Sequence, residues 1–221
     1  MKKNKFVYLK NYVTPSYLVK HVILDFSIDK KKTVLKSKFT LKANKIHNER
    51  VDLILDGKKI KLKKLSINRR KINLKSIVFK KDFMIIPKNL IDGQNFTIEM
   101  ENHIDPSSNK SLEGLYLSND IICTQCEPEG FRKICYSIDR PDILATYKVR
   151  LRGPYKCLLS NGNQVKKRRN FVEWNDPFPK PTYLFAIVAG DLSFHQDEFI
   201  TMNKKSVSLR IYHKDKDKGK T

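Results

Sequence analysis

Glycine and histidine are scarce in this chain, and neither is arranged in a pattern that builds a recognisable catalytic site. Among 221 residues there are 8 glycines and 5 histidines. No histidine pair has the HExxH spacing that places two zinc ligands on one helical face. The GxSxG elbow and the glycine-rich phosphate loop are missing as well. We therefore expect no catalytic site in the chain alone, and no metal or other cofactor bound to it.

Long apolar runs are also missing. No stretch approaches the roughly 20 apolar residues that span a bilayer. The basic start is followed by only a short apolar segment before Lys10, so the apolar core of a secretory signal is not present. We expect a cytoplasmic protein with no membrane partner. In that compartment the four cysteines should be reduced thiols. They are Cys123, Cys126, Cys135 and Cys157.

Arginine is a minority among the basic residues. The chain has 45 lysines and arginines against 23 acidic residues, a net charge of +22, and only ten of the 45 are arginine. Base-reading and bidentate phosphate sites favour arginine, and the lysines are spread along most of the chain. A solvated lysine-rich surface is favoured, and nucleic acid is not the expected partner unless the lysines gather on one face. A stand-alone basic β-domain that binds nucleic acid or a protein remains the alternative.

Apolar and polar residues alternate with a period of two through much of the chain, as in half-buried β-strands. The clearest pair, at 22–28 and 35–42, is joined by a polar turn at Asp29–Lys32. Further strands are expected at 51–55, 60–67, 72–74, 83–86, 96–100, 147–151, 171–174 and 207–211. Strands this short and close predict an all-β fold, a saddle-like antiparallel β-sandwich. We expect one domain over residues 1–212 and a charged linker or tail at 213–221.

Four local patterns add further expectations. Residues 160–163 carry the Asn-Gly signal of a hairpin turn. The segment 176–181 is too rich in proline for a sheet centre and is predicted to be an extended connector. The apolar run Tyr183–Ala189 predicts a strand buried on both faces. A short helical turn is favoured only near Pro141–Leu144.

The segment 123–127 allows more than one interpretation. Its CxxC spacing is that of a redox or zinc motif, but a second ligand pair and a helix starting at the motif are both missing. If the segment is a strand, Gln125 and Glu127 project from one face. A carboxylate beside an amide can receive an ammonium group. Two ordinary polar residues at an exposed strand end would have the same sequence.

Five blocks, in order along the chain, resemble the N-terminal domain of bacterial alanyl aminopeptidases (aminopeptidase N), which are zinc metallopeptidases of the gluzincin type. The blocks are LEGLY at 112–116, CTQCEPEGFR at 123–132, DRPD at 139–142, LLSNGN at 158–163 and WNDPFPKP at 174–181. Residues 183–190 continue the match. The resemblance is strong over 112–191 and looser over the rest of the chain.

The resemblance implies a saddle-like β-domain that packs on a thermolysin-like catalytic domain and closes one side of its cleft. It also implies that Glu127 binds the free α-amine of a peptide substrate and that Gln125 borders the pocket for the first residue. In the family, the zinc ligands and the GAMEN motif lie in the following domain. This chain alone is therefore expected to be inactive and monomeric, with that catalytic domain and the peptide N-terminus as partners. A remnant without function is the remaining interpretation.

One expectation concerns the backbone after Glu127. Peptide bonds that precede proline have a much smaller trans preference than others, and the resemblance implies a cis bond at this place. A cis bond between Glu127 and Pro128 is therefore predicted.

Overall fold

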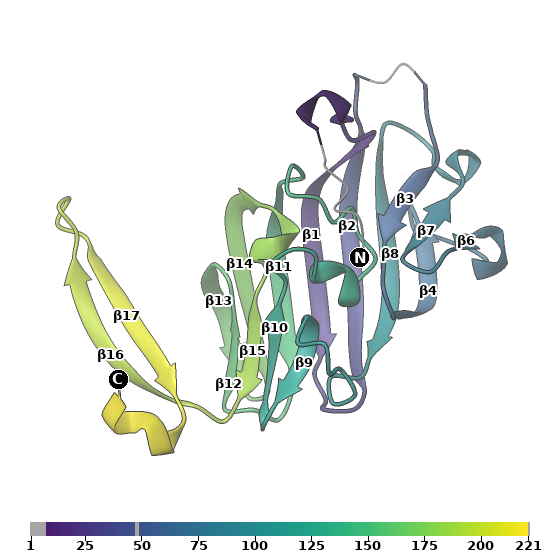
Figure 1. The fold of residues 1–221 in the computed structure, drawn as a ribbon. Helices are drawn as coiled ribbons and strands as arrows, with labels where there is room; N and C mark the ends of the chain where they lie inside the picture. The colour runs from purple at the N-terminus through teal and green to yellow at the C-terminus, as the bar shows by residue number, and fades with distance from the viewer. Residues whose placement is uncertain (1–7, 47–48, 221) are drawn as a thin grey trace.

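The molecule is organised around one large central sheet. The computed structural model describes residues 8–46 and 49–220. The strands of this sheet are β1 (Tyr17–Ser27), β2 (Thr33–Ala43), β4 (Lys61–Ile67), β5 (Arg70–Lys71), β8 (Asn95–Ile104), β11 (Ala145–Arg152), β13 (Asn163–Arg168) and β14 (Phe171–Lys180). Their order across the sheet is β13-β14-β11-β1-β2-β8-β4-β5 (Figure 1). The predicted all-β fold is confirmed.

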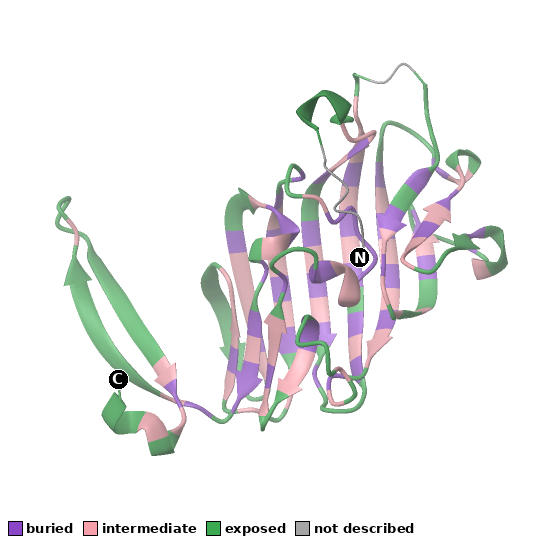
Figure 2. Ribbon diagram, in the orientation of Figure 1, coloured by how far each residue is buried: buried purple, intermediate pink, exposed green. Residues whose placement is uncertain are grey.

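The alternation in the sequence explains the centre of this sheet. β1 and β2 pair antiparallel with Phe26 opposite Leu35, and both side chains are completely buried. Buried and more exposed residues alternate along both strands (Figure 2). The pairing of β1 with β2 shifts register between Val19 and His21. The extra residue changes which face the following positions take, so the apolar side chains on both sides of the shift point into the core.

One pair of strands departs from the predicted antiparallel arrangement. β1 runs parallel to β11, with His21 opposite Thr146 and Ser27 opposite Arg152. A parallel pair needs a long crossover, whereas an antiparallel pair can be joined by a tight turn. The crossover here is the whole segment between the two strands, which contains β2 to β10, so no alternation within β1 or β11 could have revealed it.

Two smaller sheets pack against the central one. The first contains β9 (Gly114–Ser118), β10 (Ile121–Gln125), β12 (Cys157–Ser160) and β15 (Ile187–Gly190), and the second contains β3 (Leu53–Asp56), β6 (Val78–Phe79) and β7 (Phe83–Ile86). The ring of Phe185, just before β15, stacks near Phe26 and Tyr147 of the central sheet at 6.3 and 6.0 Å between centroids. It also meets Phe131 edge-on at 5.3 Å. This aromatic cluster fixes the four-stranded sheet on the central one.

The last two strands form a hairpin that extends away from the rest of the molecule (Figure 1). β16 (Ser193–Ile200) pairs only with β17 (Ser206–His213) among the described strands. Nearly every residue of this hairpin is exposed (Figure 2). The segment predicted to be a tail begins with the buried His213 and continues into a short 3-10 helix, where Ser193 donates a hydrogen bond to Asp215.

The helical segments of the described residues are all short 3-10 turns. They are η1 (Leu9–Asn11), η2 (Leu74–Ser76), η3 (Lys88–Leu90), η4 (Phe131–Lys133), η5 (Thr182–Leu184) and η6 (Asp215–Lys220). In the part of the chain that is described, none of them has the length and apolar character required to cross a membrane.

Two of the local predictions in the second half of the chain were wrong. The 160–163 turn does not close a hairpin: β12 before it and β13 after it belong to different sheets. The run Tyr183–Ala189 is not one strand, because its first part is η5 and only β15 follows. Asn161 bridges the gap by donating to the Leu184 carbonyl and accepting from the Ala186 N–H.

The segment predicted to be a proline-rich connector is part of β14. Pro177 and Pro179 lie where the pairing with β11 shifts register, between Tyr147 opposite Asp176 and Ala145 opposite Lys180. On the other side, β13 pairs with β14 only as far as Asn175. Proline is tolerated at such a bulge and at a sheet edge because no ladder hydrogen bond is required from its nitrogen.

The strand predicted at 72–74 was wrong. Residues 74–76 form η2, because the Asn73 side chain accepts a hydrogen bond from the Lys75 N–H and caps the turn. Near Pro141 the chain makes the short turn that was predicted, and Asp142 pairs there with Arg140.

Candidate functional site

Gln125 and Glu127 lie where strand β10 leaves its sheet. β10 pairs with β9 up to Gln125, opposite Gly114, and with β15 at Ile122 and Cys123. β9 and β10 form a hairpin, and β10 ends at Gln125, so Glu127 lies in the turn that follows the strand. Gln125 and Glu127 are exposed, and Cys126 between them is 3% exposed. Both polar side chains are thus presented at the surface while the cysteine anchors the backbone.

The turn after Glu127 is packed closely against the strand it leaves. The Gly130 N–H donates to the Cys126 carbonyl at 3.1 Å. A Cβ at position 130 would lie 2.3 Å from the Gln125 carbonyl oxygen and 2.8 Å from the Cys126 Cα. Only glycine fits such an approach of backbone to backbone. The position of the Gln125–Glu127 backbone therefore depends on Gly130.

The predicted cis bond was placed one residue too early. The cis peptide bond lies between Pro128 and Glu129, and the bond between Glu127 and Pro128 is trans. The proline lowers the cost of a cis bond only on its own N-terminal side, so the argument from sequence could not reach the next bond.

Arg132 and Asp139 form a buried pair beneath this turn. Arg132 Nε donates to Asp139 Oδ2 at 2.9 Å, and a terminal guanidinium nitrogen donates to the Asp139 carbonyl at 3.0 Å. The other terminal nitrogen lies 2.9 Å from Glu129 Oε2. The Asp139 side chain is 4% exposed and that of Arg132 is 15% exposed. Arg132 therefore links the turn that follows Glu127 to the segment that leads into β11.

Two further groups complete this network. Thr182 donates to the second carboxylate oxygen of Asp139 at 2.5 Å, and Asp56 accepts from the Asp139 N–H at 3.1 Å. Burial raises the pKa of Asp56 above its usual value, although the nearby charge of Arg132 opposes the shift. The network joins β3, the turn after β10 and η5, so three separate parts of the chain hold the backbone that carries Glu127.

The side chains of Gln125 and Glu127 themselves are free of intramolecular partners. Within residues 8–46 and 49–220 neither forms a hydrogen bond or an ion pair. Glu129, two residues on, has its carboxylate taken up by Arg132. A carboxylate that is not neutralised, on a backbone held in place, can accept a charge-assisted hydrogen bond from an incoming cation. The arrangement suits Glu127 for that chemistry and does not suit Glu129.

The cysteines give no support to a metal or redox site at the CxxC motif. All four are free thiols, and Cys126 and Cys135 are buried. Burial raises the pKa of the Cys126 thiol, and it raises that of Cys135 to about 12. The thiolate form that binds metals and attacks disulfides is therefore disfavoured. In the described residues no three histidine, cysteine or acidic side chains are grouped so that they could hold a metal ion.

Sequence reasoning did not single out Gly130, Arg132 or Asp139. All three belong to the blocks at 123–132 and 139–142, so a signal was present in the sequence. Their roles depend on contacts between segments, such as the one from Thr182 to Asp139, and those contacts have no signature within a single strand.

Comparison with known proteins places the chain in a defined family. The family model described as the Peptidase M1 N-terminal domain matches residues 12–184. Aminopeptidase N of Haemophilus influenzae is 40% identical over 215 residues, and aminopeptidase N of Escherichia coli is 38% identical over 215 residues. Among solved structures, aminopeptidase A of Legionella pneumophila, in complex with aspartic acid, superposes with a TM-score of 0.88 at 32% identity.

These relatives are much longer than the chain. The two aminopeptidases N match 93% of this chain, but the match spans only 24% of their own length. The Legionella pneumophila structure covers 96% of this chain, which corresponds to 26% of that protein. The fold described above, with its hairpin, is thus the N-terminal part of a larger architecture in those proteins.

Proposed function

Because the chain belongs to the Peptidase M1 N-terminal domain family, we propose that it forms the amine-binding wall of a zinc aminopeptidase that removes N-terminal residues from peptides. Glu127 accepts the α-ammonium group of the substrate, and Gln125 borders the pocket for the first side chain. The observation that carries this proposal is the exposed carboxylate of Glu127, free of any partner in the described residues, on a backbone pinned by Gly130 and the Arg132–Asp139 pair.

The chemistry of exopeptidase recognition supports this role. A free N-terminus carries a positive charge that internal peptide bonds lack, so a fixed carboxylate selects chain ends. The carboxylate is useful only if it is held in position before the substrate arrives, because the order required for binding is then already present. The network under the turn provides that order, and Glu129 is kept from competing by its contact with Arg132.

The zinc ion that the family implies does not fit the residues of this chain. In the part of the chain that the structure describes, no group of three metal-binding side chains lies close enough together. The proposal therefore assigns the metal to the polypeptide that follows the matched region in the relatives. The role of this chain ends at binding and orienting the peptide N-terminus.

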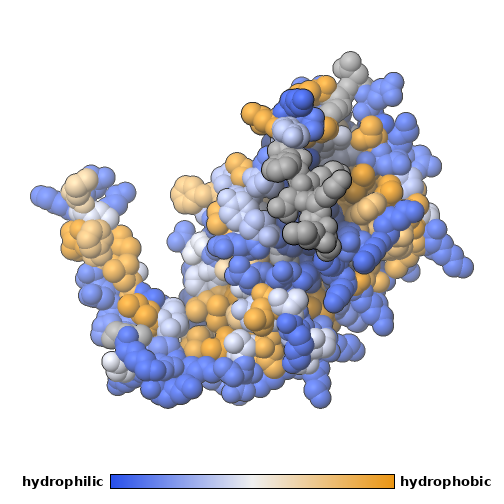
Figure 3. Space-filling view, in the orientation of Figure 1, coloured by the Kyte–Doolittle hydropathy of each residue, from blue (hydrophilic) through white to orange (hydrophobic). Residues whose placement is uncertain are grey.

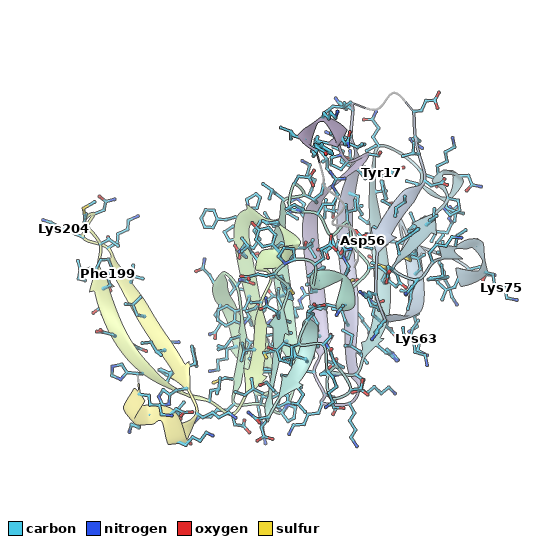
Figure 4. The ribbon with its side chains drawn as sticks, in the orientation of Figure 1. Tyr17, Asp56, Lys63, Lys75, Phe199 and Lys204 are labelled. Carbon is cyan, nitrogen blue, oxygen red and sulfur yellow. The ribbon has the colours of Figure 1, made fainter. Side chains whose placement is uncertain are left out.

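The β16–β17 hairpin supports contact with that polypeptide. Its exposed apolar side chains include Phe199, Val207, Leu209 and Ile211, each between 40% and 57% exposed. Phe199 lies opposite Val207 in the pairing, and Leu209 and Ile211 follow on the same face of the strand. Figure 3 shows hydrophobic side chains gathered along the hairpin, and Figure 4 shows Phe199 on it. A two-stranded hairpin with such a face is marginal alone in water.

We assign the cover of this face to the continuation of the chain in the relatives. These proteins extend far beyond the matched region, which is 24% of the Haemophilus influenzae protein. The hairpin also leaves both of its edges without a neighbouring strand in the described residues, and open edges accept further strands. Burial of an apolar face together with edge pairing would hold the two parts together and bring Glu127 to the cleft.

A fusion protein tests the proposal. This chain is joined to the part of the Haemophilus influenzae relative that follows the matched region, and release of alanine from an alanyl peptide is measured. We expect activity, and we expect Glu127→Gln to lower kcat/KM by about 10- to 100-fold, the value of one hydrogen bond to a charged group. The matched control is Glu49→Gln, which removes an exposed carboxylate elsewhere on the surface.

Two results would contradict the proposal. The first is a Glu127→Gln fusion as active as the unaltered one. The second is equal cleavage of a peptide and of its N-acetylated form, since an acetylated end has no ammonium group for Glu127 to bind.

A further inference from the structure

A cluster of lysines surrounds a cavity beside the turn that follows β10, and Lys133 of η4 is one of its lining residues. The cavity has a volume of about 540 Å³ and lies beside the β1–β2 turn and the end of β8. We call it the lysine pocket. The lysines that line it without an ion pair are Lys31, Lys32, Lys58, Lys59, Lys61 and Lys110. They come from the β1–β2 turn, the β3–β4 turn with the start of β4, and the loop after β8, so the lysines that are scattered in the sequence do gather at one place.

The walls of the lysine pocket are tied to one another by hydrogen bonds. The Ser107 N–H donates to the Lys30 carbonyl and joins the loop after β8 to the β1–β2 turn. Lys133 Nζ donates to Ser111 Oγ, and the Lys58 N–H donates to the Arg132 carbonyl at 2.8 Å. On the remaining side, Lys61 of β4 lies opposite His103 of β8 in the strand pairing. The charged side chains therefore project from a fixed rim.

The positive charge of the pocket is poorly neutralised by the protein. Of the seven lysines that line it, Lys133 forms an ion pair with Glu113, and the other six form none among the described residues. The single acidic lining residue is Asp105, whose carboxylate accepts hydrogen bonds from Ser107 and Ser108 within its own loop. Like charges around a cavity repel one another, and an anion in the cavity removes that repulsion.

We propose that the lysine pocket binds a compact anion that carries several phosphate groups, with a triphosphate chain as the defining chemistry. Its volume lies in the range of about 300–1,000 Å³ that is typical of small-molecule sites. The charged lining groups other than Asp105 are lysine ammonium groups, which act as point charges and suit clustered phosphate oxygens. The lining includes no arginine, whose planar fork favours a single carboxylate or phosphate held bidentately.

A nucleic acid fits these observations less well. Proteins that bind single strands combine a basic groove with aromatic side chains on which bases stack. Among the described residues that line the lysine pocket there is no phenylalanine, tyrosine or tryptophan. The recognised part is therefore the phosphate chain, whether it is free or attached to a nucleoside.

The test is a calorimetric titration of the full 221-residue chain with inorganic tripolyphosphate, ATP and orthophosphate. We expect saturable binding of one tripolyphosphate per chain, weakened by added salt, and much weaker binding of orthophosphate. If the affinity for ATP is within a few-fold of that for tripolyphosphate, the phosphate chain is the recognised group. If ATP binds markedly more tightly than tripolyphosphate, the site also contacts the nucleoside. Binding of many tripolyphosphate ions without saturation would overturn the proposal.

Matched variants separate a site from general positive charge. Lys32→Gln/Lys58→Gln/Lys110→Gln removes one lysine from each of three pocket segments, and it should weaken tripolyphosphate binding by about tenfold or more, since three nearby charges are lost. The control Lys166→Gln/Lys205→Gln/Lys216→Gln removes the same charge at exposed positions outside the lysine pocket. It should change the affinity by no more than about twofold. Equal losses in the two variants would refute a localised site. Lys59 is left unaltered because its backbone has a positive φ of 56°, and the shape of the turn depends on that conformation.

A measurement on the unaltered chain does not depend on the folding of any variant. Acetylation of individual lysines with a water-soluble reagent is followed by mass spectrometry, with and without tripolyphosphate. Lys58 and Lys110 should be protected and Lys204 should not. Uniform protection would refute the site. Tighter binding of a single-stranded oligonucleotide than of tripolyphosphate, lost in the pocket variant, would overturn the assignment to a compact anion. The outcome is independent of the aminopeptidase proposal, since no substrate amine or metal is involved.

Discussion

Arg132 Nε lies 2.9 Å from Asp139 Oδ2, and this pair is the centre of the contacts that hold the turn after Glu127. The Asp139 carboxylate receives the Arg132 side chain, the Arg132 backbone N–H and the Thr182 hydroxyl. Each of these donors comes from, or leads to, a segment that borders β10. The pair is therefore a positioning device for the proposed amine-binding carboxylate.

Asp139→Ala should destabilise the chain strongly. The substitution leaves the Arg132 guanidinium partly buried without its main partner, and the loss of one member of a buried pair costs about 3–5 kcal/mol. Urea unfolding of the variant and the unaltered chain measures the change. Glu129→Gln is the control, because the Glu129 side chain is 61% exposed and should contribute about 0–1 kcal/mol. Similar stability of the Asp139→Ala variant and the unaltered chain would show that the pair is dispensable.

Gly130→Ala should displace the backbone that carries Gln125 and Glu127. The new methyl group would meet the Gln125 carbonyl oxygen at 2.3 Å, so the turn must move, with a loss of about 1–3 kcal/mol in the free energy of unfolding. In the fusion enzyme kcat/KM should fall more than stability explains, at a temperature where the variant is folded. Gly219→Ala serves as the control because a Cβ there meets no atom within 4 Å. Equal behaviour of the two variants would contradict the close packing at Gly130.

The pair formed by Arg140 and Asp142 gives a pH dependence with a definite sign. Hydrogen bonds from Arg140 lower the pKa of Asp142 from 3.8 to about 2. A folded-state pKa below the unfolded value stabilises the fold above about pH 4, and this stabilisation is lost as the pH falls toward 2. With partial exposure taken into account, we expect a loss of about 1–2 kcal/mol in that window.

Unfolding free energies measured between pH 4 and pH 2 test this expectation. Asp142→Asn should flatten the pH dependence, whereas Asp120→Asn, at a side chain 85% exposed, should leave it unchanged. An unaltered slope in the Asp142→Asn variant would rule out this carboxylate as the source.

The hairpin face offers a test of docking that does not involve catalysis. Leu209→Lys should weaken association of this chain with the separately made remainder of the Haemophilus influenzae relative by about tenfold or more, since it places a charge in an apolar contact. The unfolding of the rest of the chain should be unaffected. Ser208→Lys, on the opposite face of β17, is the matched control. Sedimentation or size-exclusion analysis of the mixed polypeptides measures the association, and equal effects of the two substitutions would exclude this face.

The sequence alone predicts the structure correctly where a strand buries one of its two faces against the core. β1 and β2 follow from the alternation at 22–28 and 35–42, because each of these strands buries one side against the core. The exposure of Gln125 follows from the same rule, whereas Glu127 lies in the turn after β10. The function of this pair, in contrast, came from the ordered blocks, since any exposed strand end can carry two polar residues.

The sequence alone does not predict features that depend on contacts between segments far apart in the chain. The prolines of β14 are accommodated by an irregularity opposite Tyr147 that no local pattern encodes. The Asn161 side chain accepts a hydrogen bond from the Ala186 N–H, 25 residues away, just before β15 begins. The lysines of the pocket are separated by up to 102 positions, from Lys31 to Lys133, and only the folded chain brings them together.

The parallel neighbour of β1 has a consequence for synthesis on the ribosome. β1 is complete once Ser27 has been made, but its partner β11 ends at Arg152. Until that residue has left the exit tunnel, one side of β1 presents a row of unsatisfied backbone groups, which is a template for association between nascent chains. Fragments that end before β11 should therefore aggregate, while the chain that includes it should stay soluble.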